Sequence, residues 1–417
     1  MQGSSANRTI DTPQSSITEV WNTVDASRRV RHLSALLRSA RISCELQLPS
    51  GKILSFGNAA PAFRVCLRDE RGLRGLDELS VGRAYVEGAI DIQGDLSALF
   101  DLRDQVVGGA TFTQRLQLAA QLFLSHPTRV NRRSITDHYT FGDDFYLQFV
   151  DKSYRFYSHC LFEDEGEPLE QAALHKLESM FKSLRLAPGM RLLDIGGGWG
   201  GVTEYCGAQG IHVTALTLVE ESARYIRRLI DVHRLPGAVY VEDFLEHRID
   251  EPYDHAVIYG VIEHIPNYRP FCERLWDVLK PGGRLYLDAS ATVEKFDMSA
   301  FTRRYIWHGP HTFLALQDML TELLYHGFEI VEVRRETRDY ELTISHWAAR
   351  LDANHDVIAA RWGEDLYRAF RLYLWGGAHA FRTNRLQAYH LVAEKRNERG
   401  PRPGHLRRLK HFLRSLR

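Results

Sequence analysis

The feature that most limits how this chain can fold is a short apolar run that leads directly into a cluster of glycines. Residues 192–201 read LLDIGGGWGG, so that five glycines fall within six positions around Trp199. In doubly wound α/β sheets, a buried strand followed by a glycine-rich turn and a helix start is the place where nucleotide-like ligands bind. Glycines in such number indicate that something approaches this backbone closely. The sequence therefore predicts a ligand site at this strand, turn and helix.

The pattern around this cluster alternates short apolar strands with longer amphipathic stretches. The strands that we predict are RLLDI, HVTALTL, HAVIYG, RLYLDAS and FEIVEVR, and EESARYIRRLIDVHRL is one of the helices between them. Such alternation predicts parallel βαβ units, and so an α/β fold with a doubly wound sheet. An aromatic-rich helical stretch at about 339–382 precedes LQAYHLVAEK, which we interpret as a final edge strand of the same sheet. The helical stretch would then lie as a lid over the strand ends.

The chain divides into three expected regions. Residues 1–130 mix helical runs with short alternating segments, which predicts a small N-terminal α+β domain. Residues 134–395 carry the α/β pattern, and residues 396–417 form a basic tail. A length of 417 residues is sufficient for this arrangement, since domains typically contain about 100 to 200 residues.

The sequence argues against a membrane-spanning or secreted protein and against a disulfide-rich or metal-binding one. No apolar run approaches the roughly 18 residues that a membrane span needs, and the first residues lack the apolar core of a signal peptide. We therefore expect a cytoplasmic protein. The five cysteines show neither CxxC pairs nor the spacing of metal ligands, so neither a disulfide framework nor a metal site is predicted.

The basic tail has the pattern of a membrane-binding helix. From Lys395 onward the chain carries nine Lys or Arg residues against the single acid Glu398, and leucines recur at three- and four-residue spacing between the arginines. A basic amphipathic helix of this kind can lie on an anionic membrane. A disordered or partner-packed tail is an equally good interpretation. Nucleic acid is not an expected partner, because no interleaved aromatics or recognised module accompany the charge.

The spacing of the glycines narrows the kind of ligand. Asp194, Gly196, Gly198 and Gly200 form D-x-G-x-G-x-G, which differs from the dinucleotide fingerprint and fits a nucleoside with an uncharged linker. A glycine turn that only packs a strand on a helix is the alternative. The pattern resembles motif I of S-adenosylmethionine-dependent methyltransferases, in which the glycine backbone approaches the methionyl part of the cofactor.

Further motifs run in the order found in the cyclopropane-fatty-acid synthase family. They are HYTFGDDFYLQFVD at 138–151, YSHCLF at 157–162, LDIGGGWGG and TALTL, GVIEHIPNY at 260–268, KPGG at 280–283, RRYIWHG at 303–309, DYELTISHW at 339–347 and FRLYLWGGAHAFR at 370–382. GRAYVEGAIDIQGDL in the N-terminal region looks like the smaller domain of the long bacterial members. The chain thus resembles the cyclopropane-fatty-acyl-phospholipid synthases and mycolic acid cyclopropane synthases over about 134–395. The resemblance implies a Rossmann-like class I methyltransferase sheet.

This resemblance implies the transfer of a one-carbon unit from S-adenosylmethionine to the cis double bond of an unsaturated acyl chain in a membrane phospholipid. Because an alkene is a poor nucleophile, most of the rate enhancement should come from positioning. The cationic intermediate then needs a negative or π-rich surround and a base for the departing proton. A cyclopropane and a methyl- or methylene-branched chain both remain open as the product.

The resemblance also implies which residues contact the cofactor. They are Tyr157 and Ser158 at its carboxylate end, Asp194, Gly196 and Gly198 in the glycine motif, Thr217 and Leu218 at the ribose, and Asp243 and Phe244 at the adenine. The family usually has Gln where this chain has Ser222, so we expect Glu221 to take over the contacts to the ribose hydroxyls.

The catalytic centre that the resemblance implies is altered in this chain. Cyclopropane-forming members hold a bicarbonate ion, the expected proton acceptor, with a Cys, a Glu, a His and a Tyr. This chain keeps Glu263 and Tyr340, but it has His159 at the Cys position, Asp288 at the His position, and Ser290 where the family has an apolar residue. A negative Asp288 next to Glu263 would repel bicarbonate at close range, so the use of bicarbonate is doubtful.

Two interpretations of this centre remain open. In the first, Asp288 orients the imidazole of His159, and the pair is a built-in general base that replaces the ion. In the second, the two residues form a structural pair, and the enzyme closes a ring slowly or is inactive. Glu263 is expected at a strand end that faces the cofactor cleft, whereas His264 fits a site role and a packed imidazole equally well.

Two other functions also fit the sequence. A methyltransferase of a soluble small molecule would not need the bicarbonate ligands, and a non-catalytic relative would bind cofactor and lipid without reaction. The basic tail and the long N-terminal region favour membrane lipid instead. We therefore expect a peripheral protein on the inner face of the membrane, and the long family members suggest a homodimer formed through the N-terminal domain.

Overall fold

The computed structural model describes residues 28–39, 42–75, 77–106, 141–295, 298–307 and 311–399. The chain divides into two compact units, Met1–Gly108 and Gly109–Arg417. The expected boundary at 130–134 and the basic tail from residue 400 on lie outside the described residues. The division into three regions therefore stays a prediction.

The N-terminal unit is a small α+β domain, as the sequence predicts. Its elements are the strands β1 (Cys44–Gln47), β2 (Ile53–Phe56), β3 (Phe63–Leu67) and β4 (Ile90–Gly94), and the helices α2 (Arg28–Ser39), η1 (Glu70–Leu73), α3 (Glu78–Val86) and α4 (Leu96–Val106). The strands form one sheet in the order β2-β1-β3-β4, in which β1 runs parallel to β3 and antiparallel to β2. The helix α3 begins after Asp77, whose carboxylate accepts a hydrogen bond from the backbone N–H of Ser80 and so caps the first turn.

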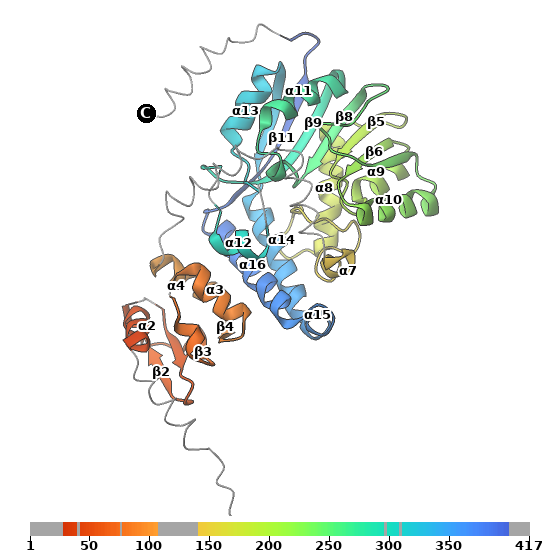
Figure 1. Ribbon diagram of the computed structural model, residues 1–417. Coiled ribbons are helices and arrows are strands. Elements are labelled where there is room, and N and C mark those ends of the chain that lie inside the picture. Colours follow the sequence, from red (N-terminus) through yellow and green to blue (C-terminus); the bar gives the residue numbers. More distant parts are fainter. Residues whose placement is uncertain are drawn as a thin grey trace, which may run out of the picture. The chain divides into compact units, whose positions relative to one another are not determined.

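The larger unit is built on a seven-stranded sheet, which Figure 1 shows with helices packed around it. Its strands are β5 (Arg191–Ile195), β6 (His212–Thr217), β7 (Gly237–Val241), β8 (Tyr253–Tyr259), β9 (Leu279–Ala291), β10 (Phe328–Arg335) and β11 (Gln387–Lys395). They lie in the order β10-β11-β9-β8-β5-β6-β7, and the strands from β9 to β7 are parallel. Successive crossovers run in opposite directions from β5 and from β8. The carboxyl ends of these two strands are therefore the switch point at which such sheets bind ligands.

Helices cover both faces of this sheet, which confirms the doubly wound α/β fold. The helices are α7 (Asp143–Tyr146), α8 (Leu169–Ser183), α9 (Gly201–Ala208), α10 (Glu220–His233), η3 (Ile262–His264), α11 (Tyr268–Val278), α12 (Ala300–Tyr305) and α13 (Leu316–Tyr325). Right-handed crossovers place α9 and α10 on one face and α11 on the other. The helix α11 shows why these segments are helical, because Phe271, Leu275 and Val278 recur at helical spacing and are all buried.

The last strand is not at the edge of the sheet, so that expectation is wrong. The strand β11 pairs antiparallel with both β9 and β10, which leaves β10 as the edge. The run from His390 to Ala393 is buried on both faces of β11, whereas β10 exposes Val331 and Val333 beside charged side chains. Burial on both faces is typical of a strand inside a sheet that is covered on both faces.

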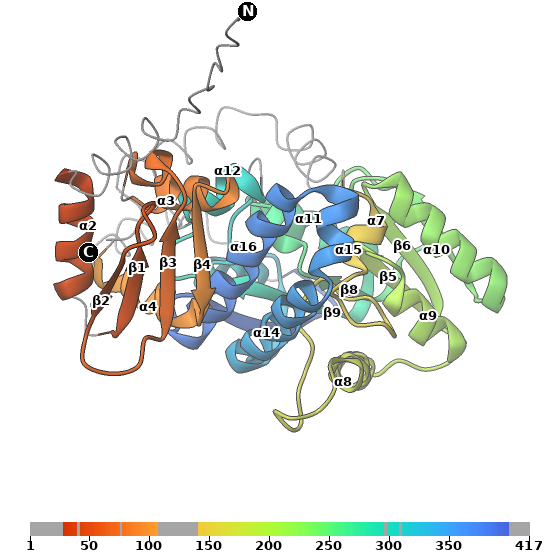
Figure 2. The same ribbon diagram turned by 90° about the horizontal axis from the view of Figure 1, so that it is seen from below.

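Three helices are inserted between β10 and β11, and they form the helical lid of the predicted fold. They are α14 (Thr337–Ala353), α15 (His355–Trp362) and α16 (Glu364–Arg382). The helices α14 and α16 lie side by side (Figure 2). Gly377 permits this packing, because a Cβ there would lie 2.5 Å from Cδ1 of Ile344 on α14.

Candidate functional site

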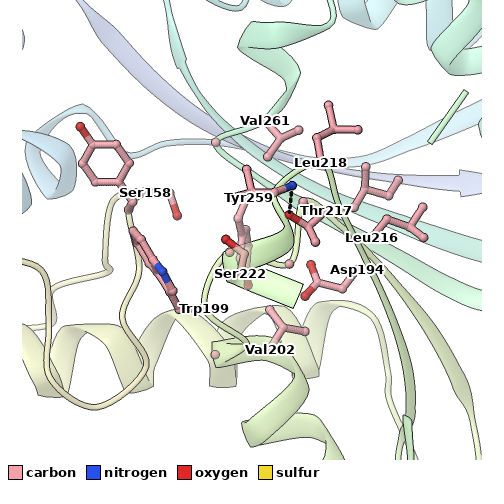
Figure 3. Close-up of a pocket in the computed structure, with 18 of the residues that line it drawn as sticks. Ser158, Asp194, Trp199, Val202, Leu216, Thr217, Leu218, Ser222, Tyr259 and Val261 are labelled. Atoms are coloured by element: carbon pink, nitrogen blue, oxygen red, sulfur yellow. Dashed lines mark hydrogen bonds between the residues drawn. The ribbon is translucent and has the colours of Figure 1, made fainter. Parts of the chain in front are cut away.

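A pocket lies at the carboxyl ends of β5, β6 and β8, at the switch point of the sheet (Figure 3). Its walls come from the stretch before α8, the loop after β5, the ends of β6 and β7, and the loop after β8. The residues are 154–158, 194–199, 201, 202, 216–219, 222, 242–244, 259–261, 264 and 265. Every wall is thus positioned by a strand end or by the segment that crosses the strand ends.

The glycine-rich loop after β5 forms one wall of this pocket. The backbone N–H groups of Gly196 and Gly197 both donate to the carbonyl of Leu216 at 2.9 Å, which ties the loop to the end of β6. Gly196 has a φ of 86°, and a Cβ there would lie 2.3 Å from Cγ2 of Val261. Gly198 has a φ of 50°, but a Cβ there would meet no described atom within 4 Å. The backbone at Gly198 is therefore open to a ligand.

The carboxylate of Asp194 lies at the end of β5, beside this loop. Asp194 is 2% exposed, and its Oδ2 atom has no hydrogen-bond partner in the described parts of the chain. Burial raises the pKa of this carboxyl to about 7. On the next strand, Oγ1 of Thr217 accepts a hydrogen bond from the backbone N–H of Val219 at 3.2 Å (Figure 3). A buried polar atom without a partner indicates a place where a ligand completes the hydrogen bonding.

All but one of the predicted cofactor-binding residues line the pocket. Those that line it are Tyr157, Ser158, Asp194, Gly196, Gly198, Thr217, Leu218, Ser222, Asp243 and Phe244. Glu221 lies outside it, half exposed on α10, with its carboxylate 2.8 Å from Arg224. Successive residues of a helix point about 100° apart, so Ser222 faces the pocket while Glu221 faces solvent. Glu242, directly after β7, also lines the pocket, and the sequence analysis missed it.

A group of buried polar side chains lies just beyond the pocket, where β8 leads into η3. Oε1 of Glu263 accepts hydrogen bonds from the backbone N–H and the hydroxyl of Ser290 at 2.9 and 2.8 Å. Its Oε2 atom has no partner within the described ranges. Burial, aided by the charge of Asp288 and opposed by the hydrogen bonds from Ser290, raises the pKa of Glu263 to about 7. Glu263 is therefore poised to change its protonation near neutral pH.

Tyr340 and His159 belong to the same group. Tyr340, in the first turn of α14, is hydrogen-bonded to Ser290, and burial holds the pKa of its phenol well above the usual range. Its ring stacks on the imidazole of His159, with centroids 4.9 Å apart and 28° between the planes. Three of the predicted catalytic side chains, Glu263, Tyr340 and His159, are thus brought together.

The fourth, Asp288, is buried nearby but does not pair with His159, so both interpretations that relied on this pair are wrong on that point. Oδ2 of Asp288 is 2.6 Å from Nζ of Lys176, and Oδ1 accepts a hydrogen bond from the N–H of Gly260 at 2.9 Å. Nε2 of His159 is 2.7 Å from Oε2 of Glu336 instead. Asp288 thus has Lys176 as its opposite charge, and an unpaired buried charge would cost several kcal/mol (roughly 3 to 5). Lys176 also offsets the negative charge expected to repel an anion.

Lys176 is the residue of this region that the sequence analysis missed. It lies on the buried stripe of α8 that runs from Leu169 to Met180. Its ammonium donates hydrogen bonds to Oγ of Ser158 and to the carbonyl of His159, both at 2.7 Å, and lies 4.0 Å from the centre of the Tyr259 ring. A lysine at an apolar position of a predicted amphipathic helix was the available signal.

Aromatic rings gather around Tyr157 at the edge of the pocket. Trp347 of α14 stacks on Tyr157 with centroids 5.3 Å apart. Trp307 stacks on His311 at 4.6 Å and contacts His264 at 5.0 Å. Burial lowers the pKa of His264 to about 4, so its imidazole is neutral at pH 7. The result is a π-rich surface in which His264 carries no charge, and such a surface can stabilise a cationic centre.

Neither a membrane span nor a metal centre is found among the described residues. No helix among them is long and apolar enough to cross a membrane. Nor do three or more His, Cys, Asp or Glu side chains of these residues come together in a way that could hold a metal ion. All five cysteines are buried free thiols.

Comparison with known sequences points to one family. A family model described as mycolic acid cyclopropane synthetase matches residues 126–391. A relative named probable fatty acid methyltransferase, from Pseudomonas putida, is 27% identical over 379 residues, which cover 87% of this chain and 94% of that protein. The cyclopropane-fatty-acyl-phospholipid synthase of Escherichia coli strain K12 is 27% identical over 271 residues, which cover 64% of this chain and 69% of that protein.

Solved structures show the same likeness. The cyclopropane synthase MmaA2 from Mycobacterium tuberculosis is 25% identical with a TM-score of 0.60, and the match covers 63% of this chain and 98% of that one. The mycolic acid cyclopropane synthase CmaA1, in complex with SAH and CTAB, is 25% identical with a TM-score of 0.59 and the same coverage. Coclaurine N-methyltransferase, bound to N-methylheliamine and SAH, shares the fold at 20% identity and a TM-score of 0.62, over 76% of this chain and 99% of that one.

Proposed function

Because this chain belongs to the mycolic acid cyclopropane synthetase family of S-adenosylmethionine-dependent enzymes, we propose that it acts on the cis double bond of an unsaturated phospholipid acyl chain. The proposed reaction transfers a one-carbon unit from S-adenosylmethionine to that bond. The product is a cyclopropane or a methyl- or methylene-branched chain.

The residues of the pocket fit S-adenosylmethionine. The open backbone at Gly198 leaves room for close approach, and the buried Oδ2 of Asp194 offers a polar atom that still needs a partner. We propose that Tyr157 and Ser158 hold the amino-acid end of the cofactor and that Thr217 lies at its ribose. The cofactor, when bound, supplies an electrophilic methyl group on a sulfonium.

The observation that carries the proposal is the position of Glu263. Glu263 comes two residues after Val261, which lines the cofactor pocket together with Gly260, and its buried Oε2 atom has no partner in the part of the chain that the structure describes. Positive charge develops on carbon when a methyl group adds to an alkene, and a carboxylate fixed in dry surroundings stabilises such charge. Methyl transfer to an amine or a hydroxyl creates no carbocation, so stabilisation of charge on carbon by this carboxylate is specific to an alkene acceptor. The position of Glu263 therefore fits an alkene, and the relatives named for fatty acids and fatty-acyl phospholipids favour it over an amine or a hydroxyl.

We propose separate roles for the predicted catalytic residues. Glu263 stabilises the developing cation, and His159 accepts the proton that the product must lose. Tyr340, stacked on His159, keeps that ring in place. Asp288, paired with Lys176, positions the pocket wall and does not act on the substrate.

The choice of a lipid acyl chain is supported by the relatives, which are named for fatty acids and fatty-acyl phospholipids. The basic tail supports a phospholipid in an anionic membrane and a peripheral position on its inner face. A homodimer formed through the N-terminal unit is a further proposal, which the mass of the protein in solution would test.

The proposed function is tested with trideuteromethyl S-adenosylmethionine, purified protein and vesicles of a cis-monounsaturated phospholipid. Mass spectrometry of the acyl chains should show label in the lipid. Two retained deuteriums mean a ring or a methylene branch, and three mean a methyl branch with the proton lost from the chain. Vesicles of the saturated phospholipid with the same head group are the control and should stay unlabelled. Tight cofactor binding without label in any lipid would contradict the acyl-chain substrate.

A further inference from the structure

Glu336 lies between His159 and His390, and each of its carboxylate oxygens contacts one of these two histidines. It stands between β10 and α14 and is 1% exposed. Its Oε2 atom is 2.7 Å from Nε2 of His159, and its Oε1 atom is 2.5 Å from Nδ1 of His390 on β11. The two histidines are 177 and 54 positions away from it in the chain, so only the fold brings the three together.

A carboxylate between two imidazoles decides which ring nitrogens carry protons. Burial alone would raise the pKa of Glu336, but the hydrogen bonds from His159 and His390 outweigh burial and hold that pKa at about 2. An ionised carboxylate only accepts hydrogen bonds, so Nε2 of His159 is the donor. In the neutral ring the other nitrogen, Nδ1, then keeps its lone pair.

Nδ1 of His159 is a buried acceptor for which the structure provides no donor. No group within the described residues bonds to it, although His159 is 1% exposed. Tyr340 covers one face of the ring, and its hydroxyl leads through Ser290 to Glu263. The preceding residue, Ser158, lines the cofactor pocket. The lone pair of Nδ1 therefore lies in the same group of buried polar side chains as Oε2 of Glu263, which also has no partner within the described residues.

We infer that Glu336 is a positioning residue that holds His159 in the Nε2–H tautomer and so makes Nδ1 the proton acceptor of the reaction, without a bound anion. The inference rests on the proposed function and assigns the fate of the proton. The substrate becomes a cation as its new C–C bond forms and the S–CH3 bond breaks. Loss of one proton from that cation to Nδ1 gives the neutral product and an imidazolium, whose charge the carboxylate of Glu336 balances.

His390 holds the same carboxylate from the other side. Its ring stacks on Tyr286 with centroids 4.8 Å apart, which fixes the plane of the imidazole. Its Nε2 atom lies 3.6 Å from Glu332. Each oxygen of Glu336 thus has one ring as its partner, and the carboxylate is not free to rotate away from His159.

Several charged or titratable groups surround His159. They are Glu336 before α14, Asp339 and Tyr340 on α14, Lys176 on α8, Asp288 on β9, Glu263 on η3, and His390 on β11 beyond Glu336. Lys176 and Asp288 offset each other. The carboxylate of Glu336 is therefore the charge that acts most directly on the ring.

The first test is the pH dependence of kcat in Glu336→Gln. The amide keeps the shape of the side chain but removes its charge, so the proton affinity of His159 falls. The acidic limb of the kcat profile should move to lower pH by about 1 unit or more. We expect kcat to fall by roughly 100-fold or more, because a misoriented base loses most of its effect. KM for the vesicles should change by less than about twofold, since substrate binding is untouched.

Two further variants separate positioning from folding. Glu336→Asp keeps the charge and should recover part of the lost rate. Glu322→Gln is the matched control, because it changes a glutamate 3.4 Å from another buried histidine, His326, and should alter neither the rate nor the pH profile. A Glu336→Gln protein that is folded and has the wild-type pH profile would overturn the inference.

A second measurement does not require turnover. Nitrogen-15 labelling of the histidines reports which ring nitrogen carries the proton, and His159→Gln identifies the signal of His159. We expect the Nε2–H tautomer in the wild-type protein and a mixture of tautomers in Glu336→Gln. A wild-type Nδ1–H tautomer would overturn the inference even if no lipid reacts. Label in the lipid together with a wild-type Nδ1–H tautomer would support the proposed function and contradict only the role assigned to Glu336.

The third test is the need for bicarbonate. Wild-type protein should turn over at the same rate, within about twofold, in CO2-free buffer and in buffer with added bicarbonate, because a side chain accepts the proton. A strict requirement for bicarbonate would mean that an ion accepts the proton and that Glu336 does not have the assigned role.

Discussion

Nζ of Lys176 and Oδ2 of Asp288 lie 2.6 Å apart, and both side chains are almost completely buried. The other hydrogen bonds of the ammonium go to Ser158 and to the carbonyl of His159, so its three donors are all used. The carboxylate also accepts from the N–H of Gly260. Since Ser158 and Gly260 belong to different wall segments of the pocket, this one ion pair links two of its walls.

We expect Lys176→Met to destabilise the protein strongly. The substitution leaves the carboxylate of Asp288 buried without its partner, which should lower the free energy of unfolding by about 3 to 5 kcal/mol. Lys176→Met combined with Asp288→Asn should recover much of this loss, because no buried charge remains. Urea denaturation at pH 7 measures both. A loss of less than about 1 kcal/mol in the single variant would show that the pair matters little for stability.

Asp194 and Glu263 should each make a contribution to the stability of the cofactor-free protein that falls as the pH rises from about 4 to 7, against an opposite contribution from His255 and His264, whose pKa values burial lowers to about 4. Asp194 and Glu263 have pKa values of about 7 in the folded protein, whereas unfolded carboxyls titrate near pH 4. In this window these two carboxyls have released their protons in the unfolded chain but still hold them in the folded one, so their contribution favours unfolding as the pH rises. Each group accounts for on the order of 4 kcal/mol. Asp194→Asn should remove its share of this slope in denaturation curves at several pH values, and an unchanged slope would contradict the expectation.

Gly198→Ala should weaken the binding of S-adenosylmethionine by tenfold or more, or about 1.4 kcal/mol. Its Cβ would project into the open space where the cofactor approaches the backbone. Gly282→Ala is the matched control, because Gly282 also has a positive φ and no described atom within 4 Å of an added Cβ, but lies at an exposed position near the start of β9. Calorimetric titration compares the two. Equal affinities would mean that the cofactor does not approach Gly198.

Glu263→Gln should lower the rate of label transfer to lipid by roughly 100- to 1,000-fold, because the carboxylate that stabilises the cation is lost. Cofactor affinity should stay unchanged, since Glu263 itself does not line the cofactor pocket. The rate comes from the deuterium assay and the affinity from titration. If Glu263→Gln loses cofactor affinity in proportion to its rate, the role of Glu263 is structural.

Removal of residues 400–417 should weaken binding to anionic vesicles and leave cofactor affinity unchanged. The cut belongs after Arg399, because the buried Nζ of Lys395 donates to the carbonyls of Trp276 and Leu279 at 2.6 Å and stabilises the end of β11. Vesicles of neutral phospholipid are the control, and binding to them should be weak for both proteins. Co-sedimentation at low and high salt measures the difference. Unchanged binding to anionic vesicles would contradict the proposal that the tail binds the membrane.

The parts of the structure that could be predicted from the sequence depend on short-range patterns. The alternation of strands and helices indicated the doubly wound sheet, and the glycine cluster at 192–201 indicated the place of the pocket, because both follow from the local backbone. The exposed position of Glu221 was also available from helical periodicity, although the sequence analysis placed it at the ribose. The position of β11 inside the sheet was not available, since strand order is a property of the whole fold.

The partners of the buried charged groups could not be predicted. Asp288 and His159 occupy the expected region, but the pairing between them was only one of several combinations. The correct partners come from elsewhere in the chain, with Glu336 lying 177 positions from His159. No local sequence pattern predicts a contact between residues so far apart in the chain. Of these groups, only Lys176 could have been recognised in the sequence, because it is a charged residue on the apolar stripe of a helix.

The place of β11 between β9 and β10 has a consequence for the timing of biosynthesis. A chain made from its N-terminus completes β5 to β9, the edge strand and the three helices of the lid before β11 exists. Until β11 is made, β10 has no strand to pair with, and Glu336 lacks the imidazole of His390. Domains generally fold as units during synthesis. This domain completes its sheet only when β11 has been made, and we therefore expect a nascent chain that lacks β11 to be inactive.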